Sequence, residues 1–528
     1  MKNVLLVCIV LLAGVLRVYQ LGTIPPSMNA DEVAIGYNAY SILKTGKDEY
    51  GKSFPLLFQS FDDYKLPLYV YAAVPSIAVF GLNDFSVRLP SAVLGTLTVL
   101  ATYMLVVSLF GSTPLALVTS FLLTISPWHL QFSRAAYEAN IAVFFTVFGF
   151  VCLLRGLKRS IFTWIGFISL ALSVWSYHSS RIFIPLMLIG FSILYLQDVR
   201  KQWKTFLYGF VLCVVICIPL VWLSLSPSGL VRARGVSALG DPGLEGRNVS
   251  WRLTDLDQGM PFSNIYHNHR LVDVGIILKG YLAHYNPAFF FLEAVQGKYH
   301  APGVGLLYLW ELPVLLLGLH VAANMKGKRK YFLFLWFLVA PLAAAPTFML
   351  PHPARTLIFL PTLQIFVAIG LLAMYKYLYQ RKIIVGLGVS IIVGSSIFYL
   401  HQYYVHAPID YALEWQFGHV QVVEEVVSRQ EKFNKVIVST SLDQPYIFFL
   451  YHLRYDPARY LEYGGTKSGK FDEERNAFDI YEFHSYANTI AMTNTLYVGT
   501  SQETLPGLTQ IAEIKDPSGA VVYVLSAK

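Results

Sequence analysis

Two adjacent carboxylates, Asp31 and Glu32, follow the first hydrophobic run of the chain and stand at the mouth of an expected membrane span. Ionisable side chains beside a membrane face are costly to keep dry, so by default they indicate a function. A carboxylate placed there has the chemistry of a general base. The structural alternative is that Asp31 caps a helix expected at 32–43, since Asp is a common N-cap and Glu is favourable in the first turn.

Further polar residues stand at the ends of later apolar runs. Arg134 and Glu138 are four residues apart, so on one helix they would share a face and form an ordinary ion pair. Lys65 follows Tyr64. Its structural alternative is that of a lysine at the membrane interface whose aliphatic stem covers apolar surface. The other candidates are Arg88, Tyr177, Arg181, His352 and Arg355. Lipid headgroups or helix C-termini are alternative partners for Arg88 and Arg355, and helix ends are alternative partners for His352. Acids and fixed cations on one face suit a substrate with a lipid tail, a phosphate and a hydroxyl partner.

The elements that must hold these residues are membrane helices. Hydrophobic residues make up 55% of the 528 residues and the mean hydropathy is +0.51, which indicates an α-helical polytopic membrane protein. The first run is followed by no small-residue cleavage site, so we expect it to be a retained span. About eleven spans are predicted, at 3–19, 86–109, 114–126, 141–155, 161–177, 182–197, 205–225, 304–324, 331–346, 356–375 and 383–400.

Short basic clusters between these spans predict the orientation. They lie at 155–159, 200–204, 326–330 and 376–382, and by the positive-inside rule they are cytoplasmic. The N-terminus is then inside, and the long loops 20–85 and 226–303 are outside. The net charge of +8 is therefore a topology signal, and no nucleic-acid partner is expected. The four cysteines lie within apolar runs and show neither metal spacing nor a disulfide framework.

The chain changes character after residue 400. Polar sequence with strand-like runs at 435–439 and 521–525, and a helix-like stretch near 411–430, predicts a small α/β domain on the outer face. We therefore expect two domains, a transmembrane domain at 1–400 and an extracytoplasmic domain at 401–528.

Four short motifs then resemble a known family. The chain is similar to GT-C glycosyltransferases, in the branch that contains protein O-mannosyltransferases and lipid A aminoarabinose transferases (glycosyltransferase family 39 and its relatives). The resemblance covers about residues 5–400. The motifs occur in the family's order and are Asn29-Ala30-Asp31-Glu32, Lys65-Leu66-Pro67-Leu68-Tyr69, Arg88-Leu89-Pro90-Ser91 and Ser133-Arg134-Ala135-Ala136-Tyr137-Glu138.

The resemblance implies a GT-C fold and an inverting transfer of a hexosyl or pentosyl group in the cell membrane. The donor would be a polyprenyl-phosphate sugar, and the acceptor a hydroxyl on a protein, lipid or glycan at the extracytoplasmic face. Asp31 would be the base, supported by Glu32, while Lys65 and Arg355 would hold the phosphate. Glu138 stands where the family usually has an aspartate. No cofactor is required by this scheme, although a divalent metal at Asp31 and Glu32 stays open.

A transporter or flippase of lipid-linked glycans is the alternative function. A transporter should carry acids or broken helices near the membrane midplane and show inverted repeats. Here the ionisable residues lie at span ends and no repeat is evident, which favours the enzyme.

Overall fold

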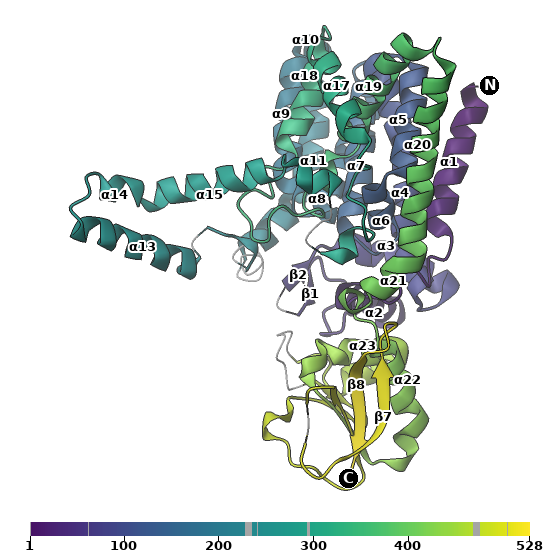
Figure 1. Cartoon of the computed structure of the whole chain (residues 1–528), viewed down its shortest axis with the longest axis vertical. Coiled ribbons are helices and arrows are strands. Elements are labelled where there is room, and N and C mark those ends of the chain that lie inside the picture. The colour runs from purple at the N-terminus through teal and green to yellow at the C-terminus, as the bar shows by residue number, and fades with distance from the viewer. Residues whose placement is uncertain are drawn as a thin grey trace.

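The computed structural model shows a helical bundle with a small sheet unit at one end (Figure 1). It describes residues 2–61, 63–226, 235–239, 241–292, 296–467, 476–503 and 505–528, with only the backbone of Asn488. Every apolar run predicted as a span contains a helix. The bundle helices are α1 (Lys2–Val18), α4 (Asp84–Phe110), α5 (Thr113–Ile125), α6 (Pro127–Ser133), α7 (Glu138–Gly156), α8 (Ser160–Ser176), α9 (Ser180–Leu194), α10 (Leu196–Lys201), α11 (Trp203–Leu225), α17 (Glu311–Ala323), α18 (Lys328–Val339), α19 (Thr362–Leu378) and α20 (Lys382–His401).

Within the described residues, five helical segments are long and apolar enough to cross a membrane. A sixth span forms if α5 and α6, which bend by 60° at their junction, are counted together. The shorter apolar helices are α3 (Pro67–Phe80), α8, α9 and α17. The protein is thus a helical, multi-pass type of chain, while the count of eleven spans stays a prediction.

Tight helix contacts and firm helix ends hold the bundle together. The helix α4 starts at a capping box of Asn83 and Ser86 and ends at Gly111, whose φ of 65° suits a residue without a side chain. A Cβ on Gly149 of α7 would lie 2.7 Å from Leu170 of α8, so these helices approach as small residues allow. The α7 helix, mostly buried, therefore forms the centre of the bundle.

The first long loop folds into α2 (Ala30–Thr45), a hairpin of β1 (Phe58–Ser60) and β2 (Asp63–Lys65), and α3. The helix predicted at 32–43 is confirmed, but the idea that Asp31 caps it is wrong. The N-cap is Asn29, whose side-chain oxygen accepts a hydrogen bond from the backbone N–H of Glu32 at 3.1 Å. Asp31 lies inside the first turn of α2. Asp62 lies outside the described residues.

The second long connection is also helical. It contains α13 (Pro242–Asp257), α14 (Ser263–Tyr266), α15 (His269–Ala283), α16 (Pro287–Phe291) and the 3₁₀ turn η1 (Gly297–Tyr299). The helices α13 to α15 form an arm that projects sideways from the bundle (Figure 1).

The predicted C-terminal α/β unit is present, with a six-stranded sheet in the order β4-β5-β3-β6-β8-β7. The central strand β3 runs parallel to β5 and β6, and the remaining pairs are antiparallel. The strands are β3 (Lys435–Val438), β4 (Ala477–Phe478), β5 (Tyr481–Phe483), β6 (Thr495–Thr500), β7 (Thr509–Lys515) and β8 (Val521–Ala527). The helices and turns are η3 (Gln402–His406), α21 (Ala407–Asp410), η4 (Leu413–Trp415), α22 (His419–Arg429), η5 (Gln430–Lys432), η6 (Thr440–Leu442), α23 (Pro445–His452), α24 (Pro457–Glu462) and η7 (Tyr486–Asn488).

This unit shares one hydrophobic core with the first long loop. Buried residues of α2 and α3, such as Tyr37 and Val70, belong to the same cluster as Phe448 of α23 and Val436 of β3. Because α2 also carries Asp31, the C-terminal unit is docked directly behind the helix that holds the candidate base.

Candidate functional site

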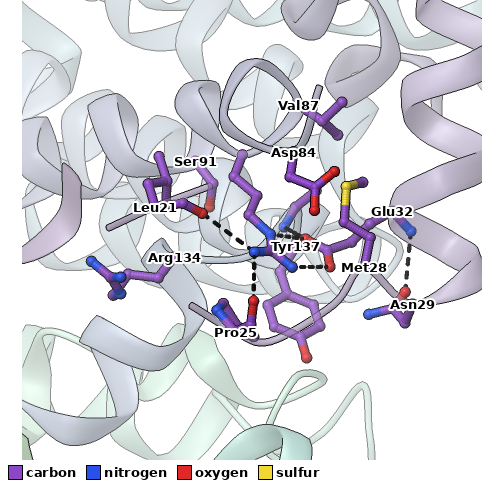
Figure 2. A network of polar contacts seen from close by, with 12 residues as sticks. Leu21, Pro25, Met28, Asn29, Glu32, Asp84, Val87, Ser91, Arg134 and Tyr137 are labelled. Carbon is purple, nitrogen blue, oxygen red and sulfur yellow. Dashed lines mark hydrogen bonds and ion pairs between the residues drawn. The ribbon is translucent and has the colours of Figure 1, made fainter. Parts of the chain in front are cut away.

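Glu32 and Arg88 form a fully buried ion pair between α2 and α4. The Nε of Arg88 donates to one carboxylate oxygen of Glu32 and Nη2 donates to the other, both at 3.1 Å (Figure 2). The side chains are 0% and 2% exposed, respectively. Ala136 donates its backbone N–H to the same carboxylate at 2.7 Å. Both carboxylate oxygens of Glu32 are thus engaged by the scaffold.

Arg88 also forms hydrogen bonds with the backbone segment that precedes α2. Its remaining N–H groups reach three carbonyl oxygens of that segment, those of Leu21 at 3.3 Å, Pro25 at 3.1 Å and Ser27 at 2.6 Å. An arginine offers five donors in a fixed fork, which suits such a clamp. The pair therefore fixes where the first turn of α2 lies.

Asp31, the neighbouring acid, faces a different partner and a different environment. Its carboxylate accepts a charge-assisted hydrogen bond from Nζ of Lys65, at the end of β2. The Lys65 side chain is only 8% exposed, whereas that of Asp31 is 66% exposed. The β1–β2 hairpin thus places the buried Lys65 beside the exposed carboxylate of Asp31, which lies 34 residues away in the chain.

Arg134 and Glu138 do not form the predicted ion pair. Arg134 ends α6 and Glu138 begins α7, so the chain breaks between them and they share no helix face. Arg134 instead donates to the hydroxyl of Tyr403 at 3.1 Å and to backbone carbonyls of the chain entering the first loop, those of Leu16, Gln20 and Ile24. Its role is to tie α6 to that segment and to η3.

Glu138 lies close to the Asp31–Lys65 pair. It is within electrostatic range of both charges, and its Oε1 is buried with no hydrogen-bond partner among the described residues. A buried carboxyl oxygen without a partner is unusual in a folded protein. It marks Glu138 as a third member of this group.

Arg355 and two tyrosines complete the wall of the site on the connections between the helices. Burial lowers the pKa of Arg355, and the nearby Tyr177 and Tyr299 act against this effect. One Nη of Arg355 donates to Thr347 Oγ1 at 2.7 Å and to the Phe348 carbonyl at 2.6 Å. Tyr299 is in turn within electrostatic range of Asp31, so the tyrosines connect Arg355 to the acid.

His352 lies beside this wall as a neutral ring. Its ring centroid is 5.3 Å from that of Tyr299, and its backbone N–H donates to Nε2 of His284 at 3.2 Å. Burial, with a smaller effect of Arg355, lowers the pKa of His352 to about 3. A neutral imidazole can accept or donate a hydrogen bond, but it has no positive charge with which to attract a phosphate.

Arg181 is separate from the other candidates. It donates to Ser224 Oγ at 3.0 Å and lines an apolar cavity of about 960 Å³ between α8, α9 and α11. No hydrogen bond or ion pair joins it to the remaining candidates in the described part of the chain.

The sequence reasoning missed four site residues, namely Gln416, Asp443, Lys298 and Tyr299. Gln416 accepts from the backbone N–H of Ala30 at 2.5 Å and donates to Asp443 Oδ2 at 2.8 Å. Burial, then the charge of Asp31, raises the pKa of Asp443, while Lys298 opposes the shift. The Lys298-Tyr299 pair repeats the basic–aromatic pattern of Tyr64-Lys65 and was detectable in principle, whereas Gln416 and Asp443 lie in no recognisable motif.

The two adjacent acids do not fit a shared metal site. Asp31 turns to Lys65 and Glu32 to Arg88, so the carboxylates do not converge on one point. No group of three or more His, Cys, Asp or Glu side chains suited to a metal occurs among the described residues.

Solved structures identify the fold of this chain. The chain matches ArnT from Cupriavidus metallidurans at 13% identity, with TM-scores of 0.56 for the apo state and 0.57 for the structure bound to undecaprenyl phosphate; the latter match covers 98% of this chain and 97% of that one. An Archaeoglobus fulgidus oligosaccharyltransferase tethered to an acceptor peptide matches at 14% identity with a TM-score of 0.51, covering 85% of this chain. The chain spans only 63% of that enzyme's length. The fold is that of the GT-C glycosyltransferases.

The sequence itself agrees with this class. Residues 7–226 match the family described as dolichyl-phosphate-mannose-protein mannosyltransferase, which confirms the resemblance drawn from the motifs over that part of the chain. A comparison with curated proteins finds no match.

Proposed function

We propose that this protein is an inverting GT-C glycosyltransferase that moves a sugar from a polyprenyl-phosphate donor to an acceptor hydroxyl at the extracytoplasmic face. The observation that carries the proposal is the pairing of an open carboxylate, Asp31, with a buried cation, Lys65, at the outer end of the bundle. The family match over residues 7–226 supports the reaction type, and the fold shared with ArnT bound to undecaprenyl phosphate supports the donor class.

Asp31 acts as the general base. It accepts the proton of the acceptor hydroxyl as that oxygen attacks the anomeric carbon. The bond between this carbon and the phosphate oxygen breaks, and the phosphate leaves with the electron pair. A positioned base contributes roughly 10²–10⁴-fold to such a step. Glu138, with one oxygen that has no hydrogen-bond partner among the described residues, is the second acid and lies within range of both Asp31 and Lys65.

Lys65 and Arg355 hold the leaving phosphate. Preorganised cations aimed at developing charge usually provide the largest catalytic contribution, and they act more strongly where water is excluded. Lys65 is almost fully buried, and burial already disfavours the charge of Arg355. An anionic phosphate would relieve that penalty. Tyr177 and His352 offer hydrogen-bonding groups beside it.

Glu32, Arg88 and Arg134 serve as positioning residues. Each is committed to the scaffold by the hydrogen bonds described above, so we assign them to the placement of α2 and its entry segment. This is a different role from the support of catalysis and substrate contact that the motifs suggest for them.

The apolar cavity between α8, α9 and α11 suits the isoprenoid tail of the donor. Its lining is almost entirely hydrophobic, and Arg181 with Ser224 supplies a polar end. On the acceptor side, Asp443 and Lys298 flank the open face of Asp31. The acceptor is therefore recognised in part by the C-terminal unit.

The proposed function requires the two termini to lie on opposite sides of the membrane. The basic clusters put the N-terminus inside and residues 401–528 outside. Ser468, a convenient loop position, lies outside the described residues, so Ser518 in the exposed turn between β7 and β8 is a better probe. A Ser518→Cys variant should react with an impermeant maleimide in intact cells. Labelling only after permeabilisation would contradict the site assignment.

The direct test is a transfer assay. The purified protein in bilayers would be incubated with a panel of labelled polyprenyl-phosphate sugars and with peptide, lipid and glycan acceptors. We expect label to move to one acceptor class and the anomeric configuration to invert. Movement of an intact labelled lipid across the bilayer without transfer would favour the flippase. Retained configuration would contradict the single displacement.

A further inference from the structure

The arm formed by α13, α14 and α15 (residues 241–285) exposes a continuous apolar stripe. On α15 the side chains of Leu271, Val274, Leu278 and Leu282 are 53%, 60%, 55% and 57% exposed. Their spacing of three and four residues places them on one face of the helix. A soluble helix buries such a face, so this one lacks its apolar environment within the chain.

The stripe continues over the rest of the arm. On α13, Val249, Leu253 and Leu256 follow the same helical spacing and are 45%, 51% and 49% exposed. Trp251 is 57% exposed, with the guanidinium of Arg247 5.7 Å from its ring. At the tip the exposed apolar side chains are Met260, Phe262, Ile265 and Tyr266.

Polar contacts, not this stripe, hold the two halves of the arm together. His267 contacts Asn248 and Asp255 of α13 through its two ring nitrogens, at 2.9 Å each. Ser263 donates to the carbonyl of Arg252 at 3.2 Å. The hairpin is thus built without using its exposed apolar residues, which remain available to an outside partner.

The root of the arm is fixed to the bundle. A Cβ on Gly280 would lie 2.2 Å from the carbonyl oxygen of Ala345, so α15 packs directly on the backbone that follows α18. Tyr281 and Tyr285 donate to the carbonyls of Leu338 and Phe337 at 2.9 and 3.0 Å. The arm therefore has a set direction, across the long axis of the bundle helices (Figure 1).

We propose that the arm lies along the outer membrane surface with its apolar stripe inserted among the lipids. The surface of α11, which precedes the arm in the chain, is also apolar and open, with Trp222 79% and Leu225 70% exposed. The stripe extends this lipid-facing surface sideways. Amphipathic helices bind in this way, with the apolar face at the boundary between headgroups and acyl chains.

The charges on the arm indicate what kind of lipid it needs. Four basic residues face five acidic ones, so no excess charge favours anionic headgroups; they are Arg247, Arg252, Arg270 and Lys279 against Asp241, Glu245, Asp255, Asp257 and Asp273. Insertion is therefore driven by burial of the apolar side chains, and it occurs in a zwitterionic phosphatidylcholine bilayer. This proposal does not depend on the sugar-transfer function.

Lipid-borne quenchers test the insertion. A Leu278→Cys variant of a chain without Cys8, Cys152, Cys213 and Cys217 would carry a bimane label in phosphatidylcholine nanodiscs, with Asp273→Cys on the opposite side of α15 as the matched control. We expect doxyl groups near the headgroup to quench the Leu278 label at least about threefold more than the control, as interfacial insertion requires.

Two results would overturn the proposal. Quenching of the Leu278 label by aqueous iodide but not by doxyl lipid places the arm in water. Protection from both quenchers shows that protein, such as a second copy of the chain, covers it. If the cysteine-free chain does not fold, the wild-type protein labelled by a lipid-borne diazirine gives the same answer, since Leu271 to Leu282 should then carry the adducts.

Discussion

The ion pairs of Asp31 and Glu32 differ far more than their adjacent positions suggest. Glu32 meets Arg88 in a fully buried contact with both carboxylate oxygens engaged. Asp31 meets a buried lysine but keeps its own side chain 66% exposed. The first turn of α2 therefore carries two adjacent acids with different roles. Glu32 stabilises the fold, and Asp31 is exposed to a substrate.

This difference has an energetic consequence. Breaking a buried pair by removing one partner leaves an uncompensated charge in a region of low dielectric, whereas pairs with an exposed member contribute little to stability. Stability should thus depend on Glu32 and Arg88, and chemistry on Asp31 and Lys65. The following substitutions separate the two.

The largest effect is expected for Arg88→Ala. It leaves the Glu32 carboxylate buried without its cation and removes three bonds to the segment before α2. We expect a loss of about 3–5 kcal/mol in the free energy of unfolding, measured by thermal unfolding in detergent. Arg247→Ala, on the exposed arm, is the matched control and should change stability by less than about 1 kcal/mol. Equal melting temperatures would remove the buried pair from the scaffold.

Glu49 extends the comparison to a buried acid without a cation. It is 1% exposed and accepts hydrogen bonds from Asn38 at 2.8 Å and from Thr466 and Tyr446 of the C-terminal unit at 2.7 and 3.3 Å. Burial raises its pKa from the usual 4.5 to about 7. Between these values the folded chain keeps a proton that the unfolded chain has lost, so stability falls as the pH rises.

The expected loss between pH 4.5 and 8 is at most about 3 kcal/mol, because each pH unit separating the two pKa values is worth about 1.4 kcal/mol. Thermal unfolding across this range measures it. Glu49→Gln should abolish this contribution, while Glu462→Gln, an exposed acid of α24, should leave the pH profile unchanged. A profile that is flat in the wild type would contradict the buried protonated carboxyl.

Asp31→Asn tests the open acid. Asn29 provides the cap of α2, so the amide costs the helix little, but it cannot accept a proton as a base. We expect near-wild-type expression and melting temperature, with sugar transfer lowered at least ~10²-fold. Asp63→Asn, in the same loop, should transfer normally. If the Asp31→Asn variant transfers sugar normally, Asp31 is not the base and Glu138 becomes the candidate.

The sequence predicted the elements better than the contacts between them. Apolar runs gave the bundle helices, and the Asn-Ala-Asp-Glu stretch gave α2, because periodicity and hydropathy are local properties. The alternative that Asp31 caps α2 was wrong by two positions, because the cap is Asn29, and local patterns do not resolve such a difference. The same limit applies to Arg134 and Glu138, whose helix is broken between them.

The pairing of charges was beyond local reasoning. Arg88 reaches Glu32 across 56 residues and Lys65 reaches Asp31 across 34, and both contacts depend on how α2, α4 and the β1–β2 hairpin pack. The contribution of Gln416 and Asp443 depends on the docking of a C-terminal unit whose sequence carries no motif. A pattern thus identifies charged residues on one face but not which of them neutralise each other.

Lys65→Ala gives the smallest effect and the sharpest test of what its pairing with Asp31 means. A charge-assisted hydrogen bond to phosphate is worth about 1.5–3 kcal/mol, so donor affinity and turnover should fall roughly tenfold or more while the melting temperature holds. Lys65→Arg should recover part of the donor affinity, and Lys52→Ala, an exposed lysine of the same loop, should change neither property. If Lys65→Ala binds donor as well as the wild type does, Lys65 is an interfacial lysine whose stem covers apolar surface, and the phosphate is held by Arg355 without it.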